Sequence, residues 1–340
     1  MTVPDTMNAL AIARPGNPDV LQLQTRPVPP CADNEMLVRV AAAGVNGPDL
    51  AQRRGHYDPP PGASALPGLE VSGEIVALGN DVAGWKLGDR VMALTNGGGY
   101  ADYVTVPAGQ ALPVPDGWAL AEAAALPETW FTITQTLVMR AGLEPGMTVL
   151  VHGAAGGIGS AAIQIATILG ASAIAVVSSA AKADHALHLG ASATIDYTTE
   201  DIVARTLDLT AGKGVDRVVD IIGGAMTEKN IAASARGGHI VQISTLEGGS
   251  ANLSLRAMMT KDLTLSGSTL RPQPPLAKAA IASRIRADLL PALSRPGFVR
   301  PTLTRFPIQE GPAAHHLMET RTHLGKIVLL TPFGAEAERA

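Results

Sequence analysis

The sequence predicts an α/β protein in which a doubly wound domain with a parallel sheet is inserted into a β-rich domain. Three observations carry this prediction. Residues 1–127 are rich in Pro and Gly and hold short β-like runs, residues 128–268 alternate strand-like and helix-like runs, and residues 269–340 return to mixed character. Strands separated by helices of this length favour a parallel sheet with right-handed crossovers. We therefore expect the first and last segments to form one domain around the middle one.

Local patterns place the elements. In the first segment, apolar runs bounded by Pro, Gly and Asp turns predict strands at 36–42, 71–78 and 90–94. In the middle segment, apolar runs alternate with helical spacing. The expected order there is strand 148–152, helix 157–169, strand 173–177, helix 182–189, strand 194–197, helix 202–209, strand 215–222, helix 228–235 and strand 239–243. The last segment is expected to hold helix 278–293, strand 326–330 and a frayed tail at 333–340.

Composition excludes several classes of protein. The 340 residues carry a net charge of −4, so no basic surface for nucleic acid is expected. The single cysteine, Cys31, excludes an internal disulfide and any zinc site built from several cysteines. Residues 145–181 hold no charged side chain, but glycines cut this run into pieces too short to span a membrane. The first residues lack the basic region of a signal peptide, so we expect a cytoplasmic protein without a membrane partner.

The sharpest motif is the glycine turn between the expected strand 148–152 and the helix that follows it. In the pattern G-x-G-x-x-G, its three positions are Ala154, Gly156 and Gly159. Such a turn lets the backbone approach a pyrophosphate, and the helix N-terminus favours an anion. We therefore expect a dinucleotide to bind here, and the alternative is an ordinary glycine-rich turn between a strand and a helix. The expected contacts are Ala155, Gly156, Gly157, Ile158 and Gly159.

The end of the next expected strand indicates which dinucleotide. NAD-binding domains place an acidic side chain about 20 residues after the glycine turn, on the ribose hydroxyls. Here the strand is followed by Ser178 and Ser179, with Lys182 just beyond and no Asp or Glu at the strand end. Two hydroxyls and an ammonium group suit a 2′-phosphate, so NADP(H) is the expected cofactor. The alternative is that Lys182 is only a solvated residue at the start of a helix.

Longer stretches resemble a known family. The chain is similar to the zinc-free quinone oxidoreductases (zeta-crystallin group) of the medium-chain dehydrogenase/reductase superfamily, and most similar to the branch of tumour-suppressor-inducible NADPH quinone oxidoreductases. The resemblance covers residues 7–331. The matching stretches are AGVNGPDLAQRRGHYDPPPGAS (43–64), PGLEVSGEIVALG (67–79), WKLGDRVMAL (85–94), AAALPETWFTITQTL (123–137), HALHLGA (185–191), GGAMTEKN (223–230) and LGKIVLL (324–330). The resemblance implies a GroES-like catalytic domain, an inserted Rossmann domain, a cleft between them and a homodimer.

Departures from the zinc-dependent members of the superfamily bear on the reaction. Asn46 stands where those enzymes have a cysteine ligand and Leu69 where they have a histidine ligand. Residues 95–99 pass through the region of their structural zinc lobe without a cysteine. Leucine cannot bind zinc and an amide oxygen binds it poorly, so no metal is expected. The substrate should then be a small molecule that is already electrophilic, such as a quinone or an activated alkene.

The resemblance also assigns site residues. It implies that Asn46 and Asp49 line or support the site near the nicotinamide, and that the hydroxyl of Tyr57 orients the acceptor or cofactor. Each has a plainer interpretation: Asn46 as a turn brace, Asp49 as a structural hydrogen-bond partner, Tyr57 as loop packing. Further cofactor contacts that the resemblance or the strand ends imply are Thr132, Tyr197, Ser244, Thr269, Leu270 and Lys326.

Other polar pairs are expected to lack a function. His185 and His188 share a helix face, and His315 and His316 are adjacent, which is typical of solvated helix histidines. Arg53 and Arg54 are expected to be a surface pair, and the alternative is a minor aid in attracting phosphate.

These observations together predict an NADPH-dependent quinone oxidoreductase that transfers hydride directly and without metal to a quinone acceptor. One alternative is an alkenal or enone double-bond reductase on the same scaffold. An alternative of another class is a sensor or scaffold protein that binds NADPH without useful turnover.

Overall fold

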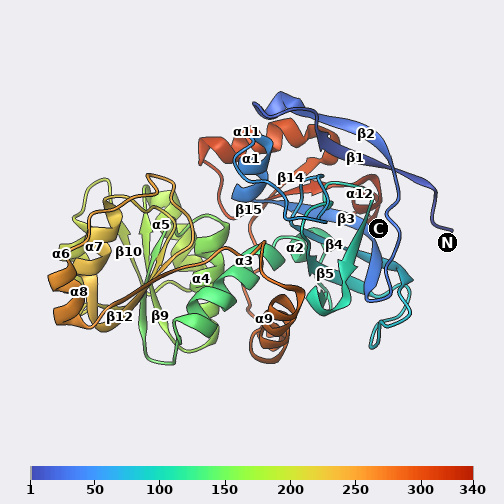
Figure 1. The fold of residues 1–340 in the computed structure, drawn as a ribbon. Coiled ribbons are helices and arrows are strands. Elements are labelled where there is room, and N and C mark those ends of the chain that lie inside the picture. Colours follow the sequence, from blue (N-terminus) through green and yellow to red (C-terminus); the bar gives the residue numbers. More distant parts are fainter. Residues whose placement is uncertain (1, 340) are drawn as a thin grey trace. The chain divides into compact units, whose positions relative to one another are not determined.

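The computed structural model describes residues 2–339, and the chain divides into two compact units. The first contains residues 2–131, 271–286 and 293–339, and the second contains 132–270 and 287–292. Both ends of the chain therefore belong to the first unit (Figure 1). No helix within residues 2–339 is both long and apolar enough to cross a membrane.

The second unit is built on a six-stranded sheet in which every pairing is parallel. Across the sheet the strands run β10 (Ala193–Asp196), β9 (Ser172–Val177), β8 (Thr148–His152), β11 (Val215–Asp220), β12 (Ser234–Gln242) and β13 (Thr264–Gly267). The chain thus forms β8 in the middle of the sheet and adds β9 and β10 on one side. It then returns to add β11, β12 and β13 on the other side, which is the doubly wound order. Its helices are α4 (Gly157–Ile168), α5 (Ala180–His188), α6 (Ile202–Leu209), α7 (Met226–Ala233) and α8 (Leu255–Lys261). The expected α/β class with a Rossmann-type sheet is confirmed.

The first unit is organised around a mixed sheet of the GroES-like kind. The path across it is β14 (Leu303–Pro307), β15 (Lys326–Leu330), β3 (Glu35–Val45), β4 (Glu70–Leu78), β5 (Arg90–Leu94) and β7 (Ala111–Pro113), with β6 (Tyr103–Pro107) also paired to β3. A separate antiparallel pair joins β1 (Thr6–Ile12) to β2 (Leu21–Pro27). Figure 1 shows this pair beside α11. Buried aliphatic side chains of β3, β4, β5 and β15 form the main core.

The first unit also contains helices of 4 to 14 residues. They are α1 (Gly47–Arg53), α2 (Leu120–Ala123), α9 (Pro275–Asp288), α11 (Gly311–Thr320) and α12 (Pro332–Ala337), with 3₁₀ turns at Pro18–Val20, Ala108–Gln110 and Ile308–Glu310. The chain passes between the units through α3 (Pro127–Ile133), which runs on into a π-helix at Thr134–Arg140, and through α10 (Leu290–Leu293).

Several elements have the bounds that the sequence predicts, and others differ for physical reasons. Strands β5, β8 and β15 and helix α6 match the expected ranges. The expected helix 278–293 is two helices because Pro291 has no N–H to donate and its ring crowds the preceding turn. The expected helix 228–235 stops at Ala233, where Ser234 turns to extended backbone and pairs with Val215.

The expected frayed tail is wrong. Residues Pro332–Ala337 form α12, which begins at Thr331 as N-cap. The hydroxyl of Thr331 accepts a hydrogen bond from Gly334 N at 3.2 Å and donates one to Val40 O at 2.6 Å. A cap that is itself bonded to the central strand β3 holds this helix on the sheet.

Candidate functional site

The glycine turn of the second unit has the geometry of an anion cradle. Strand β8 ends at His152, and α4 begins at Gly157 with Gly156 as N-cap and no capping side chain. A Cβ on Gly156 would meet only Gly153 O, at 3.6 Å, so this side of the turn is open. A Cβ on Gly159 would lie 2.4 Å from Ala154 Cα, so here the helix packs directly on the turn. An open turn at an uncapped helix N-terminus fits a pyrophosphate group.

Polar side chains gather at the end of the neighbouring strand β9. Lys182 Nζ donates to Ser178 Oγ at 3.0 Å, and Ser179 caps α5 by accepting from Lys182 N at 3.4 Å. Tyr197 follows the adjacent strand, with its N–H bonded to Val177 O at 3.1 Å and its side chain 54% exposed. The structure thus brings these four predicted cofactor residues to one edge of the sheet.

The remaining cofactor residues predicted in this unit are placed by different elements. Ser244 follows β12, and Thr269 and Leu270 follow β13, so all three come after carboxyl ends of parallel strands, where such sheets bind ligands. Thr132 stands on α3, where its carbonyl accepts from Thr136 Oγ1 at 2.7 Å.

Beneath the glycine turn lies a buried polar chain that the sequence did not reveal. His152 Nε2 is 2.7 Å from Asn230 Oδ1, and Asn230 Nδ2 donates to Asp220 Oδ2 at 2.9 Å. Asp220 Oδ1 also accepts from the N–H groups of Ile222 and Gly223. Burial lowers the pKa of His152, against the attraction of Asp220. A neutral His152 therefore links the ends of β8 and β11 and fixes the backbone beside the turn.

In the first unit, Asn46 lies within a buried ion pair. Its Nδ2 donates to Glu70 Oε1 at 2.8 Å, and its Oδ1 accepts from Lys326 Nζ at 2.6 Å. Lys326 Nζ also bonds directly to Glu70 Oε1 at 2.5 Å, and both charged side chains are almost fully buried. Both polar ends of the Asn46 amide are therefore occupied. Gly44 makes room for this pair, because a Cβ there would overlap the Glu70 carboxylate.

Asp49 has the contacts of a structural brace. It is fully buried, and its carboxylate accepts from Asn46 N at 2.9 Å and from Gly68 N at 2.8 Å. Burial raises its pKa to about 6, against the lowering effect of those two N–H groups. Asp49 thus ties the start of α1 to the glycine turn that precedes β4, which agrees with the plainer of its two interpretations.

Tyr57 is half-buried and packs near a fixed cation. Arg271 Cζ lies 5.5 Å from the centre of the Tyr57 ring. The guanidinium is held by Gln52 Oε1 at 2.8 Å and by Asn96 O at 2.8 Å. Lys278 Nζ donates to Asn96 Oδ1 at 2.5 Å and to Arg271 O at 2.7 Å. Burial raises the pKa of Tyr57 above its usual value, and the nearby Glu128 acts in the same direction.

Three of these groups were missing from the predicted site. Glu128, Arg271 and Lys278 are all buried, which is uncommon for charged side chains. Each is far from Asn46 and Tyr57 in sequence, so no local spacing could have found it.

A second buried network corrects two expectations. His315 and Arg53 are fully buried, although both were expected at the surface. His315 Nδ1 lies 3.3 Å from Arg53 Nη1 and its Nε2 lies 3.1 Å from Tyr100 OH. Arg53 can only donate, so His315 accepts at Nδ1 and carries its proton on Nε2. Burial lowers the pKa of His315 to about 3, and Arg53 also pairs with Glu319. His185 was likewise expected to be solvated, and it is buried.

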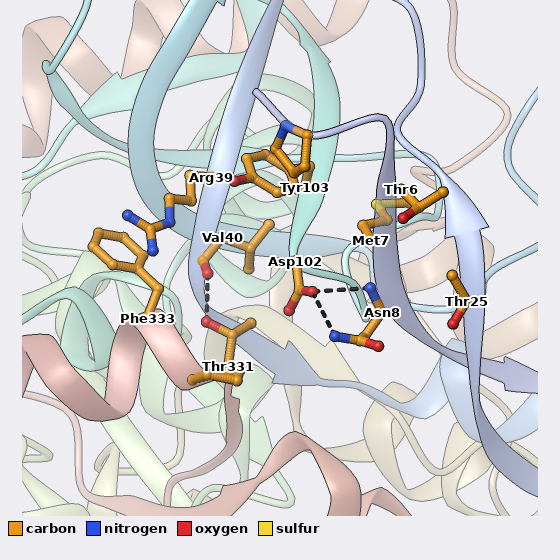
Figure 2. Close-up of a pocket in the computed structure, with 12 residues that line it drawn as sticks. Thr6, Met7, Asn8, Thr25, Arg39, Val40, Asp102, Tyr103, Thr331 and Phe333 are labelled. Carbon is orange, nitrogen blue, oxygen red and sulfur yellow. Dashed lines mark hydrogen bonds between the residues drawn. The ribbon is translucent and has the colours of Figure 1, made fainter. Parts of the chain in front are cut away.

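A separate cavity of about 430 Å³ opens elsewhere in the first unit. Figure 2 shows Asn8 bonded to Asp102 on one side of it, and Arg39 over the ring of Phe333 on the other. None of the predicted site residues lines this cavity. Within the described chain, no three His, Cys, Asp or Glu side chains come together as a group that could hold a metal.

Comparisons with known proteins agree with this architecture. Residues 32–116 match the model of the alcohol dehydrogenase GroES-like domain, and residues 157–283 match a model described as zinc-binding dehydrogenase. The chain is 32% identical to a synaptic vesicle membrane protein VAT-1 homolog of Rattus norvegicus, over 95% of this chain and 84% of that protein. It is 30% identical to a quinone oxidoreductase of Lama guanicoe, over 95% of this chain and 97% of that protein.

Solved structures with the same fold belong to proteins that are named for different reactions. An NAD-dependent alcohol dehydrogenase has a TM-score of 0.82 at 31% identity, over 95% of this chain and 99% of its own. The CurK enoyl reductase has a TM-score of 0.83 at 27% identity, over 97% and 100%. A mycobacterial protein in complex with NADPH has a TM-score of 0.81 at 29% identity, over 95% and 100%.

Proposed function

The chain belongs to the quinone-oxidoreductase-like family of medium-chain dehydrogenases/reductases, and on that premise we propose that it is an NADPH-dependent quinone oxidoreductase that acts without zinc. That it is an oxidoreductase of this family follows from the comparisons. The choice of NADPH, of a quinone acceptor and of metal-free chemistry is our proposal.

The observation that carries the proposal is the state of Asn46. Its amide oxygen accepts from the ammonium of Lys326 at 2.6 Å, and its amide nitrogen donates to Glu70. A cation already bonded to this oxygen would repel a zinc ion, and Leu69, where zinc-dependent relatives have histidine, offers no ligand atom. Zinc normally polarises an alcohol or carbonyl substrate, so the substrate should be electrophilic without help. Quinones meet this requirement.

The preference for NADPH rests on the end of β9. Lys182 and Ser178 already share a hydrogen bond there and can both bind a 2′-phosphate, and no carboxylate stands at the strand end to bind the ribose hydroxyls instead. The mycobacterial neighbour in complex with NADPH agrees with this choice.

The chain's residues then have separate roles. The backbone amides from Gly157 to Gly159 bind the pyrophosphate at the start of α4. When bound, NADPH supplies a hydride from its nicotinamide ring. The hydroxyl of Tyr57 donates a hydrogen bond to the acceptor oxygen, on which negative charge develops during reduction, and Arg271 holds the Tyr57 ring in place. Positioning of two reactants supplies most of the rate enhancement in such a reaction.

The proposal is tested by following NADPH oxidation with an ortho-naphthoquinone, before and after treatment of the protein with a chelator. We expect saturable turnover that the chelator does not change. Absence of turnover with every quinone tried, or activity that returns only with zinc, would contradict it.

A second candidate is an enone or alkenal double-bond reductase, which the likeness to the CurK enoyl reductase favours. Hydride would then go to the β-carbon, and Tyr57 would serve the enolate oxygen. Comparison of kcat/KM for a quinone and an enone separates the two functions. A sensor or scaffold protein would instead bind NADPH tightly and turn over none of the acceptors.

The family resemblance also supports a cytoplasmic homodimer as part of the proposal. Light scattering on the purified protein measures the oligomeric state, and a monomer at micromolar concentration would contradict the dimer.

A further inference from the structure

The cavity of about 430 Å³ in the first unit takes no part in the proposed reaction. Its volume lies within the range of about 300–1,000 Å³ that is typical of small-molecule sites. Its walls come from β1 and β2 near the N-terminus, from β3 and β6 of the sheet, and from the start of α12 near the C-terminus (Figure 2). The lining combines apolar side chains and hydroxyl groups with one acidic and one basic residue, Asp102 and Arg39.

Asp102 is fixed in the wall of this cavity by four hydrogen bonds. Its N–H donates to Asn8 O at 3.0 Å, and its carbonyl accepts from Val40 N at 2.9 Å. Its carboxylate oxygen Oδ2 accepts from Asn8 N at 2.9 Å and from Asn8 Nδ2 at 3.1 Å. The other oxygen, Oδ1, points away from Asn8 (Figure 2), and it forms no hydrogen bond or ion pair within residues 2–339. One oxygen of this carboxylate therefore serves the fold, and the other is open to a ligand.

Arg39 is held on the opposite side of the cavity. Its Cζ lies 4.1 Å from the centre of the Phe333 ring, which belongs to the first turn of α12. That helix is itself fixed, because its N-cap Thr331 donates to Val40 O on β3 at 2.6 Å. A guanidinium over an aromatic ring keeps its N–H groups at its edge, where they can bind a carboxylate. The cavity thus holds a positive and a negative group in set positions on two sides.

The two charges together select the class of ligand. A simple amine is attracted by Asp102 but repelled by Arg39, and a simple carboxylate meets the reverse. We propose that this cavity binds a small zwitterion, whose ammonium group bonds to Asp102 Oδ1 and whose carboxylate bonds to the Arg39 guanidinium. The fold already orders both side chains, so binding loses little conformational entropy. None of the lining residues belongs to the proposed reaction, so this inference does not depend on the proposed function.

Isothermal titration calorimetry of the full chain tests the class of ligand. The zwitterions are glycine, γ-aminobutyrate and ε-aminocaproate, which differ in the separation of their charges, and butylamine and butyrate carry one charge each. We expect saturable binding of at least one zwitterion with a Kd of about 1 mM or lower, and binding of butylamine and butyrate that is at least about tenfold weaker. Absence of saturable binding by all three zwitterions, or equal affinity for butylamine or butyrate, would overturn the inference.

Asp102→Asn separates the contact with the ligand from the contacts that hold the fold. The amide oxygen of this variant can still accept from Asn8, while an NH₂ group replaces Oδ1. Its melting temperature should therefore change little, and its affinity for the zwitterion should fall at least about tenfold. Asp116→Asn makes the same change at an exposed position outside the cavity and should leave the Kd unchanged. Wild-type affinity in Asp102→Asn would overturn the inference.

Thr25→Trp tests the location of the site even if Asp102→Asn does not fold. Thr25 is exposed on β2, lies opposite Asn8 in the strand pair and lines the cavity. An indole ring at this position fills the cavity and leaves both charges in place, so binding of the zwitterion should be lost. Wild-type affinity in a folded Thr25→Trp variant would place the ligand elsewhere and contradict the inference.

Discussion

The predicted site residues of the two units are organised in opposite ways. In the second unit the proposed cofactor site consists of backbone amides and short side chains at strand ends, with Tyr197 half-exposed. Around the predicted site residues of the first unit, polar side chains are buried and bonded to each other, as in Glu70, Asn46 and Lys326. Some substitutions in the second unit should therefore change cofactor binding without changing stability. In the first unit the same side chains serve the site and stabilise the fold, so a substitution should change both.

The largest effect should come from the buried ion pair. Lys326→Met leaves the Glu70 carboxylate buried without its cation, which costs about 3–5 kcal/mol in the free energy of unfolding. Lys213→Met is the matched control, because Lys213 pairs with Asp216 at 3.1 Å in the second unit but is itself 67% exposed. An exposed pair contributes about 1 kcal/mol or less. Urea denaturation measures the free energy of unfolding of both variants. Equal losses in the two variants would contradict the greater role assigned to the buried pair.

The His315 network predicts that the first unit loses stability in acid. The pKa of His315 is about 3 in the folded protein and about 6.5 in an unfolded chain, so only the unfolded chain takes up a proton between these values. Stability is therefore fully present above pH 6.5 and is lost as the pH falls. The loss from this residue between pH 7 and pH 5 is about 2 kcal/mol.

Urea denaturation at the two pH values measures this loss. His315→Gln should reduce the pH dependence by that amount, whereas His316→Gln at the adjacent exposed position should leave it unchanged. An identical pH dependence in the wild type and in His315→Gln would mean that burial does not set the protonation of this residue.

Substitution of two glycines in the turn of the second unit should affect different properties: stability at Gly159 and NADPH binding at Gly156. Gly159→Ala brings a methyl group to 2.4 Å from Ala154 Cα, and such overpacking costs about 1–3 kcal/mol in unfolding free energy. In Gly156→Ala the methyl group meets only Gly153 O at 3.6 Å, so stability should not change. It would, however, stand where the pyrophosphate approaches, so the Kd for NADPH should rise. Fluorescence titration and thermal melting together test this pair, and unchanged NADPH binding in Gly156→Ala would contradict the cradle.

The smallest effect concerns cofactor choice. Lys182→Ala removes an ammonium group bonded to Ser178, and loss of a charged hydrogen bond to a 2′-phosphate should weaken NADPH binding about tenfold. NADH lacks that phosphate, so its Kd should stay the same. Lys182→Arg is expected to keep the preference for NADPH. Equal losses for both cofactors in Lys182→Ala would assign Lys182 a purely structural role.

The site of the second unit could be predicted from the sequence more fully than that of the first. The cradle at 153–159 and the residues 178–182 are each contiguous, so spacing and residue type predict them, and the fold class follows from the alternation of strands and helices. Asn46, Asp49 and Tyr57 came from a resemblance rather than from physical reasoning. The bonds of Asn46 to Glu70 and Lys326 could not be predicted, because pairing of β3 with β4 and β15 brings these distant segments together. Helical spacing likewise could not show that His315 faces Arg53 and Tyr100 rather than water.

The central claim is tested most directly by the stoichiometry and isotope dependence of one reaction. Chelator-treated protein is mixed with an ortho-naphthoquinone and with NADPH carrying deuterium at the transferred position. Direct hydride transfer to a quinone without metal predicts that one NADPH is consumed for each hydroquinone formed. It also predicts that turnover with the deuterated NADPH is slower than turnover with unlabelled NADPH. Turnover that requires added zinc, or NADPH that binds and is never oxidised by any acceptor, would contradict the account.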